Sequence, residues 1–393
     1  MTREPELAAA TLTEEDEPLR RIIGHIIGDQ PGPTLICIGG VHGNEPAGVR
    51  ALRRVFQALE DDRPHLRGQF VGLVGNIAAL AAQRRYLDRD LNRRWLPKTL
   101  DKLADGLDSA AALPEDRECY QLLAELGRLF QESAGNVFII DLHTTSGESI
   151  PFVVMGDTLR NRDFALKFPL PLVLGLEEYL DGTISEYLTS RGHVTITVET
   201  GQHTSPTAVD HAEAAIWTAL TSLGILERRS DPNVLGSAAR LAQAADSLPR
   251  ILEVLYRHPV SKQDAFRMEP GFLNFQPIQP AQLLARDRTG EIRSRWQGRI
   301  LMPLYQELGE DGFFVVREFK PGWLKISSLL RRLRLDAIAH WLPGISRHPT
   351  RPDTFVVDRK IARWFTTELL HLLGFRKRRA VGDVLLVSRR RHS

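Results

Sequence analysis

Short runs rich in β-branched residues alternate with longer helical patterns between residues 34 and 230, and this alternation constrains the fold more than any other feature. It is typical of an α/β domain whose parallel or mixed sheet is flanked by helices. The expected strands are 34–40, 69–76, 136–143, 151–156 and 193–200. Each strand ends in glycine or polar residues, and ligands of such sheets bind beyond the carboxyl ends of the strands. We therefore expect the functional site at that edge.

The chain has 393 residues, which is longer than one ordinary compact domain. We expect an α/β domain over 1–231 and, after a polar, alanine-rich stretch, a smaller β-rich domain over 232–320. Residues 321–393 hold 16 Lys and Arg against 5 Asp and Glu, whereas residues 1–320 hold 35 against 44. This contrast predicts a separate basic extension, and its amphipathic pieces predict that it is partly helical.

No apolar run approaches the roughly 20 residues that a membrane helix needs. The first residues, MTREPELAAATLTEEDEPLR, are acidic, unlike a signal peptide. The two cysteines, Cys37 and Cys119, lie in apolar runs and are expected to be core residues rather than a disulfide. We therefore expect a cytoplasmic protein without a membrane span.

A candidate metal site begins in the glycine-rich segment that follows the first expected strand. His42 and Glu45 offer a nitrogen and an oxygen ligand three residues apart, and the glycines at 39, 40 and 43 allow a sharp bend. Such a pair is weak evidence by itself, because it arises by chance on many helices. A catalytic zinc site needs three protein ligands and leaves a fourth position for water.

The third ligand is expected at another strand end, where His143 directly follows an apolar run. Asp141 points the same way on an extended strand and could orient this histidine. The alternative is that His143 is a satisfied core histidine. Because His42 and Glu45 are two further candidate ligands, the metal site is favoured over this alternative.

Glu199 ends a third strand and is the best-placed carboxylate to act as a general base. The alternative is a strand-end glutamate that faces solvent. In RRYLDRDLNRRW, residues 84–95, five arginines stand close to Asn92, with Asp88 and Asp90 able to pair with surplus arginines. Arginine binds carboxylates in a bidentate way, so this stretch is a candidate anion site, although a charge run is often only a solvated surface.

Taken in order, the segments GGVHGNE, RYLDRDLNR, DLHTTSG and VETG resemble the signatures of the succinylglutamate desuccinylase and aspartoacylase family, a branch of the zinc carboxypeptidase clan. The resemblance covers residues 33–205 by motif. It implies one zinc ion per chain, with His42, Glu45 and His143 as ligands, and Glu199 as the residue that activates water. It also implies a zinc-carboxypeptidase-like fold with a small C-terminal β domain.

The same resemblance implies roles for the arginine-rich segment. Arg85 would polarise the scissile carbonyl and stabilise the oxyanion, whereas Asn92 and Arg93 would hold the substrate α-carboxylate. Two departures concern specificity. Thr189, with Arg191 nearby, stands where the aspartoacylase pattern has an arginine, and Gly312, Phe313 and Phe314 stand where it has a tyrosine.

The expected function is a zinc-dependent amidohydrolase that removes the acyl group from a small N-acyl amino acid, a carboxylate substrate. One alternative is a zinc carboxypeptidase that acts on short peptides. A second is a non-catalytic zinc-fold protein whose basic tail binds polyanions. The tail carries no recognised nucleic-acid motif, and it could equally contact another copy of the chain in a homo-oligomer.

Overall fold

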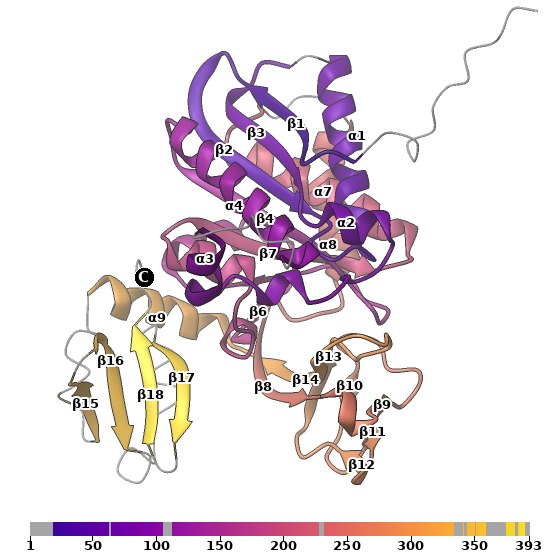
Figure 1. Ribbon diagram of the computed structural model, residues 1–393, viewed down its shortest axis with the longest axis vertical. Helices are drawn as coiled ribbons and strands as arrows, with labels where there is room; N and C mark the ends of the chain where they lie inside the picture. Colours follow the sequence, from indigo (N-terminus) through magenta and orange to yellow (C-terminus); the bar gives the residue numbers. More distant parts are fainter. Residues whose placement is uncertain are drawn as a thin grey trace, which may run out of the picture.

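The computed structural model describes residues 19–62, 64–104, 112–227, 232–333, 341, 344–349, 351–358, 375–381 and 384–389. Its helices are α1 (Ala47–Asp62), α2 (Ile77–Ala81), η1 (Leu91–Arg93), α3 (Pro97–Ala104), α4 (Pro114–Glu132), α5 (Leu159–Ala165), η2 (Leu176–Glu178), α6 (Ile184–Ser190), α7 (Pro206–Ser222), α8 (Pro232–Ala245), η3 (Lys262–Asp264) and α9 (Pro321–Arg332). The first ten strands are β1 (Ile22–Ile27), β2 (Gln30–Gly39), β3 (Arg67–Val74), β4 (Val137–Thr145), β5 (Phe152–Met155), β6 (Leu172–Leu174), β7 (Val194–Gln202), β8 (Ile251–Pro259), β9 (Arg267–Met268) and β10 (Pro277–Ile278). The remaining strands are β11 (Leu283–Asp287), β12 (Gly290–Arg293), β13 (Gly298–Leu301), β14 (Asp311–Glu318), β15 (Ile345–His348), β16 (Arg351–Asp358), β17 (Phe375–Val381) and β18 (Val384–Arg389). Figure 1 shows their arrangement.

One mixed sheet of eleven strands runs through the molecule in the order β1-β3-β2-β4-β7-β5-β6-β8-β14-β13-β10. The four strands β3, β2, β4 and β7 are parallel neighbours, and β5 pairs antiparallel with β7. All five expected strands are present as β2, β3, β4, β5 and β7, and the predicted mixed α/β fold with a β-rich C-terminal part is confirmed.

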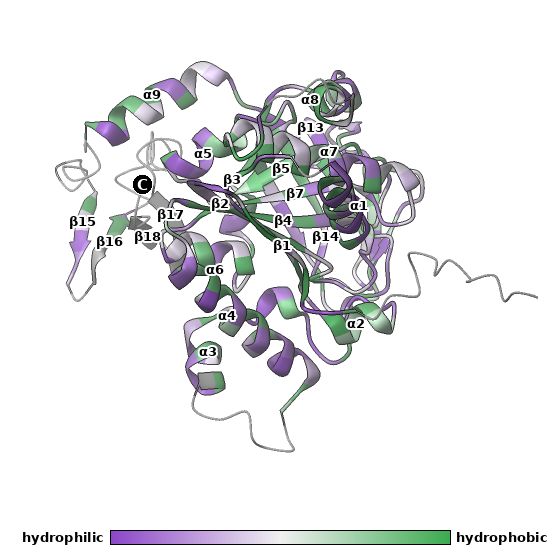
Figure 2. Ribbon diagram, turned by 90° about the horizontal axis from the view of Figure 1, so that it is seen from above, coloured by the Kyte–Doolittle hydropathy of each residue, from purple (hydrophilic) through white to green (hydrophobic). Residues whose placement is uncertain are grey.

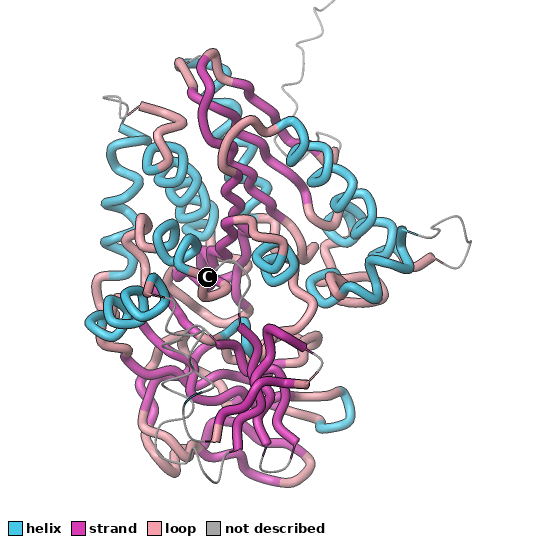
Figure 3. Tube along the Cα trace, turned by 90° about the vertical axis from the view of Figure 1, so that its left-hand side faces the viewer, coloured by secondary structure: helices cyan, strands magenta, loops and turns pink. Residues whose placement is uncertain are grey.

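The central strands are buried on both faces because helices cover both sides of the sheet (Figures 2 and 3). Along β2, Leu35 and Cys37 belong to the core that includes α1 and α7, whereas Ile36 and Ile38 belong to the core that includes α4. Successive side chains of a strand point to opposite faces, so an unbroken apolar run satisfies both layers. Cys37 and Cys119 are buried and unpaired with each other, as expected for core residues.

The alanine-rich stretch after residue 231 is a helix, α8, rather than a simple separator. It packs along α7, and Val234, Leu241 and Ala245 join the same core as α1. The chain then continues the main sheet, because β8 pairs parallel with β6 and antiparallel with β14. A separate three-stranded sheet, β12-β11-β9, contains the hairpin predicted for RDRTGEI.

The basic extension begins with a helix, as predicted, but its described part also contains a four-stranded antiparallel sheet, β15-β16-β18-β17, that was not predicted. In β17 four consecutive residues of the sequence FRKRRAV are charged, so it lacks the apolar alternation by which a half-buried strand is recognised. Most of the amphipathic piece 329–342 and the acidic residues 1–18 lie outside the described residues.

A buried ionic clamp fixes α9 to the α/β core. Arg331 donates to the Asp157 carboxylate at 2.6 Å and to the Asp157 carbonyl oxygen at 2.8 Å. Arg162 donates to the same carboxylate at 2.8 Å and to the Ser327 hydroxyl at 3.1 Å. Leu324 completes the contact by packing into the main core. The start of the extension is therefore part of the folded body.

Among the described residues, no helix has the length and apolar character needed to span a bilayer.

Candidate metal centre and active site

The loop between β2 and α1 brings His42 and Glu45 to the carboxyl edge of the sheet. Gly40 has a φ of +68°, in the left-handed region that favours glycine. A Cβ at Gly43 would lie 2.1 Å from the backbone of Ala79, so this position has no room for a side chain. The glycines of the segment thus allow the tight path that turns both side chains inward.

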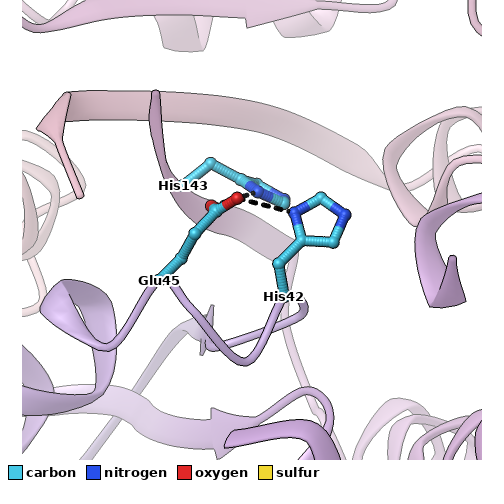
Figure 4. A group of neighbouring side chains, drawn as sticks. All are labelled: His42, Glu45 and His143. Carbon is cyan, nitrogen blue, oxygen red and sulfur yellow. Dashed lines mark hydrogen bonds and ion pairs between the residues drawn. The ribbon is translucent and has the colours of Figure 1, made fainter. Parts of the chain in front are cut away.

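His42, Glu45 and His143 converge from this loop and from β4 (Figure 4). The Glu45 carboxylate lies 2.8 Å from Nδ1 of His42 and 3.0 Å from Nδ1 of His143. Their candidate ligand atoms all lie within 4.8 Å of one another, and the three side chains are buried. The structure thus brings together the three residues predicted as metal ligands.

The charges of this group suit a cation. Burial alone would raise the pKa of Glu45, but His42 and His143 hold that pKa well below its usual range. Burial alone would lower the pKa of His143, but the carboxylates of Asp141 and Glu45 hold it well above its usual range. Two imidazole nitrogens and one carboxylate, with room for water beside them, form a donor set that catalytic zinc uses in proteins. The residues present therefore fit a zinc ion.

Two aspartates lie against the ring nitrogens of the histidines that do not face Glu45. The Asp141 carboxylate lies 3.0 Å from Nε2 of His143 on the same face of β4, which agrees with the predicted orienting role. The Asp90 carboxylate lies 3.0 Å from Nε2 of His42 and 3.1 Å from Arg85. Asp90 was predicted only as a partner for arginines, and its contact with His42 was missed. The available signal for a place in the site was that Asp90 stands two residues before Asn92, a predicted site residue.

Glu199 lies beside the metal group and not on the surface. Its register partner across β4 and β7 is His143, and only 6% of Glu199 is exposed. Its Oε2 atom is buried without a hydrogen-bond partner. The pKa of Glu199 is raised to about 8, chiefly by burial; His143 opposes this rise, whereas Glu45 and Asp141 add to it. The solvent-facing alternative is therefore excluded, and Glu199 is a carboxyl group able to exchange a proton near neutral pH.

The guanidinium of Arg85 faces the same group, 3.5 Å from Glu45 and 3.1 Å from Asp90. Burial alone would lower the pKa of Arg85, but Asp90 and Glu45 raise it, so the side chain keeps its charge. Its Nε atom is buried without a hydrogen-bond partner. Arg85 is thus a fixed positive charge at the edge of the metal group.

Asn92 and Arg93 lie on η1 and line the same pocket, with the Asn92 side-chain nitrogen 3.5 Å from Nε2 of His143. The Asn92 side-chain oxygen accepts the Ile184 N–H at 2.9 Å, which fixes the start of α6. Arg93 donates to the Asn92 carbonyl oxygen at 2.9 Å and to Asp311 at 3.3 Å. Asn92 and Arg93 of the candidate anion site therefore do not belong to a solvated helix face.

A cavity of about 140 Å³ collects the site residues. Its lining includes His42, Arg85, Asn92, Arg93, His143 and Glu199. Residues of the later β-rich part complete its walls, among them Met302, Gln306 and Phe314. The pocket is therefore built from both the α/β part and the strands after residue 250.

Of the positions that depart from the family pattern, Phe314 lines the cavity, whereas Thr189 and Phe313 do not. Thr189 is buried against Gly156 and accepts a hydrogen bond from Asn161 at 3.2 Å. Phe313 packs in the β-rich core and stacks on His258, whereas its neighbour Phe314 lines the cavity. Arg191 lies over the ring of Tyr187. Spacing along a chain does not decide which face of a helix or strand a side chain occupies, and of these residues only Phe314 lines the cavity.

One network of pocket residues was missed from the sequence. His203 contacts the Thr144 hydroxyl at 2.7 Å and the Gln306 side-chain oxygen at 3.3 Å. The same Gln306 oxygen accepts from Asn44 at 3.1 Å. These contacts join the metal-binding loop to a loop more than 250 residues away, and no local pattern signals such a pairing.

Comparison with known proteins identifies the class to which this fold and site belong. Residues 31–222 match the profile of the succinylglutamate desuccinylase/aspartoacylase catalytic domain. A probable aspartoacylase from Synechococcus is 36% identical over 151 residues, which is 37% of this chain and 44% of that protein. An N-acyl-aromatic-L-amino acid amidohydrolase (carboxylate-forming) from Xenopus laevis is 33% identical over 141 residues, which is 35% of this chain and 41% of that protein. The chain spans about half the length of the curated relatives it matches.

The fold is also shared with solved structures. A succinylglutamate desuccinylase/aspartoacylase from Rhodobacter sphaeroides superposes with a TM-score of 0.56 at 17% identity and covers 76% of this chain and 88% of that one. Fold and site together define an α/β protein with a candidate metal centre at the carboxyl edge of its sheet. Residues 31–222, about half of the chain, therefore form a domain similar to the catalytic domain of the succinylglutamate desuccinylase and aspartoacylase family.

Proposed function

We propose that this protein is a zinc-dependent deacylase that hydrolyses the amide bond of an N-acyl amino acid. The observation that carries the proposal is the convergence of His42, Glu45 and His143 with Glu199 and Arg85 in one buried pocket. Its similarity to this family and the amidohydrolase and desuccinylase names of its relatives support this reaction class.

The ligand group would hold one zinc ion per chain. Such an ion supplies Lewis-acid chemistry, since it makes water more acidic and polarises a carbonyl group. The contribution of the chain begins with Glu199, whose carboxylate takes a proton from the attacking water and delivers it to the leaving nitrogen. A C–O bond forms and the C–N bond breaks, which yields a carboxylate and a free amino acid.

Two further groups complete the reaction. The Arg85 guanidinium stabilises the negative charge that develops on the carbonyl oxygen. Asn92 and Arg93 position the substrate through its α-carboxylate, which suits the fork geometry of arginine. His42 and His143 are held in orientation by Asp90 and Asp141, so the ligand geometry is set before an ion arrives.

The test combines metal content with a substrate panel. Purified protein should bind about one zinc per chain and hydrolyse N-acetyl amino acids faster than dipeptides, which separates a deacylase from a carboxypeptidase. His143→Ala should lose zinc and activity, whereas Glu213→Gln on α7 should keep both. Zinc-loaded protein whose hydrolysis survives both His143→Ala and Glu199→Gln would refute the proposed mechanism.

A further inference from the structure

The site cavity is lined by charged, polar and apolar side chains. Arg85 lies beside the metal group, and seven apolar side chains also line the cavity. These side chains are Val154, Met155, Leu176, Leu180, Met302, Leu304 and Phe314. They come from β5, η2 with its following turn, the loop before β14, and β14 itself. A substrate side chain in this cavity would therefore find an apolar surface to pack against.

The described residues that line the cavity include no lysine and no arginine other than Arg85 and Arg93. Both guanidiniums already have a role in the reaction proposed above. Arg93, moreover, lies 3.3 Å from Asp311, so its charge is already shared with a carboxylate of the chain. Outside the candidate metal group, the described lining of the cavity therefore holds no further lysine or arginine to receive a second carboxylate.

Acidic side chains also line the cavity away from the metal. Glu177, Glu186, Glu310 and Asp311 all contribute to its walls. Glu186 accepts the Gly182 N–H at 3.1 Å, and the Glu310 carboxylate lies 3.7 Å from Arg93. A second substrate carboxylate would lose its water and approach these groups without a new positive partner. Burying a charge without a partner is costly, and like charges add to that cost.

We infer that the substrates of this protein carry a single carboxylate: they are N-acyl derivatives of amino acids whose side chain is apolar, with an uncharged acyl group. This inference rests on the proposed deacylase function. It separates the chain from enzymes of the succinylglutamate desuccinylase and aspartoacylase family whose names denote an aspartate or succinyl-glutamate substrate, because those substrates carry an additional carboxylate. Phe314 and Leu180, rather than Thr189 and Phe313, would then face the substrate side chain.

The sharpest test compares substrates that differ in charge and hardly in shape. The pair N-acetylglutamine and N-acetylglutamate isolates one negative charge, and N-acetyl-leucine adds the apolar reference. We expect kcat/KM to fall in the order leucine, glutamine, glutamate, with at least about a hundredfold loss from glutamine to glutamate. N-succinyl-leucine should be cleaved as poorly as N-acetylglutamate. Equal or faster cleavage of the dicarboxylates would overturn the inference and leave the deacylase function standing.

A binding measurement tests the inference without catalysis. Free leucine at saturating concentration should raise the melting temperature of the zinc-loaded protein more than free aspartate or glutamate does. Leu180→Arg adds a cation to the apolar wall, and Leu180→Gln is its neutral control of similar length. The arginine variant should bring the glutamate-to-glutamine ratio of kcat/KM closer to one, and the glutamine variant should not. If no N-acyl amino acid is hydrolysed, the proposed function fails, whereas stronger stabilisation by aspartate than by leucine refutes this inference.

Discussion

Two buried groups of charged side chains differ in how completely the chain satisfies them. In the clamp between α9 and the α/β core, one carboxylate, Asp157, receives both Arg162 and Arg331. In the site, Glu199 Oε2 and Arg85 Nε are buried without hydrogen-bond partners. Folding normally pairs buried polar atoms, and these two unpaired atoms belong to side chains that line the cavity, where a bound molecule could contact them. The clamp serves stability, whereas the site gives up stability for chemistry.

The largest effect should come from Glu199→Gln. We expect kcat to fall by about 10²–10⁴-fold, because the amide cannot accept and return a proton. The free energy of unfolding of the metal-free protein should not fall, because the substitution removes a carboxyl group that is buried near Glu45 and Asp141. Steady-state kinetics and urea unfolding measure the two quantities. A matched loss of stability would mean that Glu199 supports the fold as the clamp residues do.

Zinc should stabilise the site and leave the clamp unaffected. At about a thousandfold excess over its dissociation constant, the ion should add about 4 kcal/mol to the free energy of unfolding. His143→Ala should abolish this gain, because it removes one of the three ligands. Arg331→Met should retain the gain at full size. Differential scanning calorimetry with and without zinc distinguishes the cases, and a gain that persists in His143→Ala would place the ion elsewhere.

Arg331→Met should destabilise the protein by about 3 kcal/mol, because it leaves a buried carboxylate with one partner fewer. Arg332→Met is the matched control, since Arg332 is the exposed next residue of the same helix. Thermal and urea unfolding measure the difference. Equal effects of the two substitutions would show that the helix rather than the clamp is responsible.

The smallest effect concerns pH. Burial lowers the pKa of His193, His211 and His258. Below pH about 6.5 these histidines take up protons in the unfolded chain, whereas in the folded chain they stay neutral to a lower pH. The contribution of these three histidines to the free energy of unfolding should therefore be fully present above pH about 6.5 and be lost as the pH is lowered.

His211 offers a way to test this dependence next to the site, because its ring donates to the carbonyl oxygen of Thr200 at 3.0 Å. His211→Gln keeps a donor but cannot gain a proton, so the loss of melting temperature between pH 7.5 and 5.5 should become smaller. His65→Gln, at an exposed position, should leave that loss unchanged. An unchanged loss in His211→Gln would contradict the assignment.

Local pattern was sufficient for the strands and for the grouping of the three candidate ligands. Apolar runs such as TLICIGG predict buried strands. Because β2 and β4 are parallel neighbours, their carboxyl ends place His42 and His143 at the same edge of the sheet. The pairing of β6 with β8 could not be predicted, because it depends on contacts between segments distant in sequence. The contact of Asp90 with His42 and the position of Gln306 could not be predicted for the same reason.

The eleven-stranded sheet restricts how substrates could reach the pocket. The metal-binding loop follows β2, and Phe314 lies on β14 of the same hydrogen-bonded sheet. Because both sides of the pocket belong to one hydrogen-bonded sheet, they cannot separate by a hinge motion without breaking backbone hydrogen bonds. Access must therefore depend on movements of side chains and of the loop between β13 and β14. Changes of substrate range would arise by altering that loop while the sheet stays unchanged.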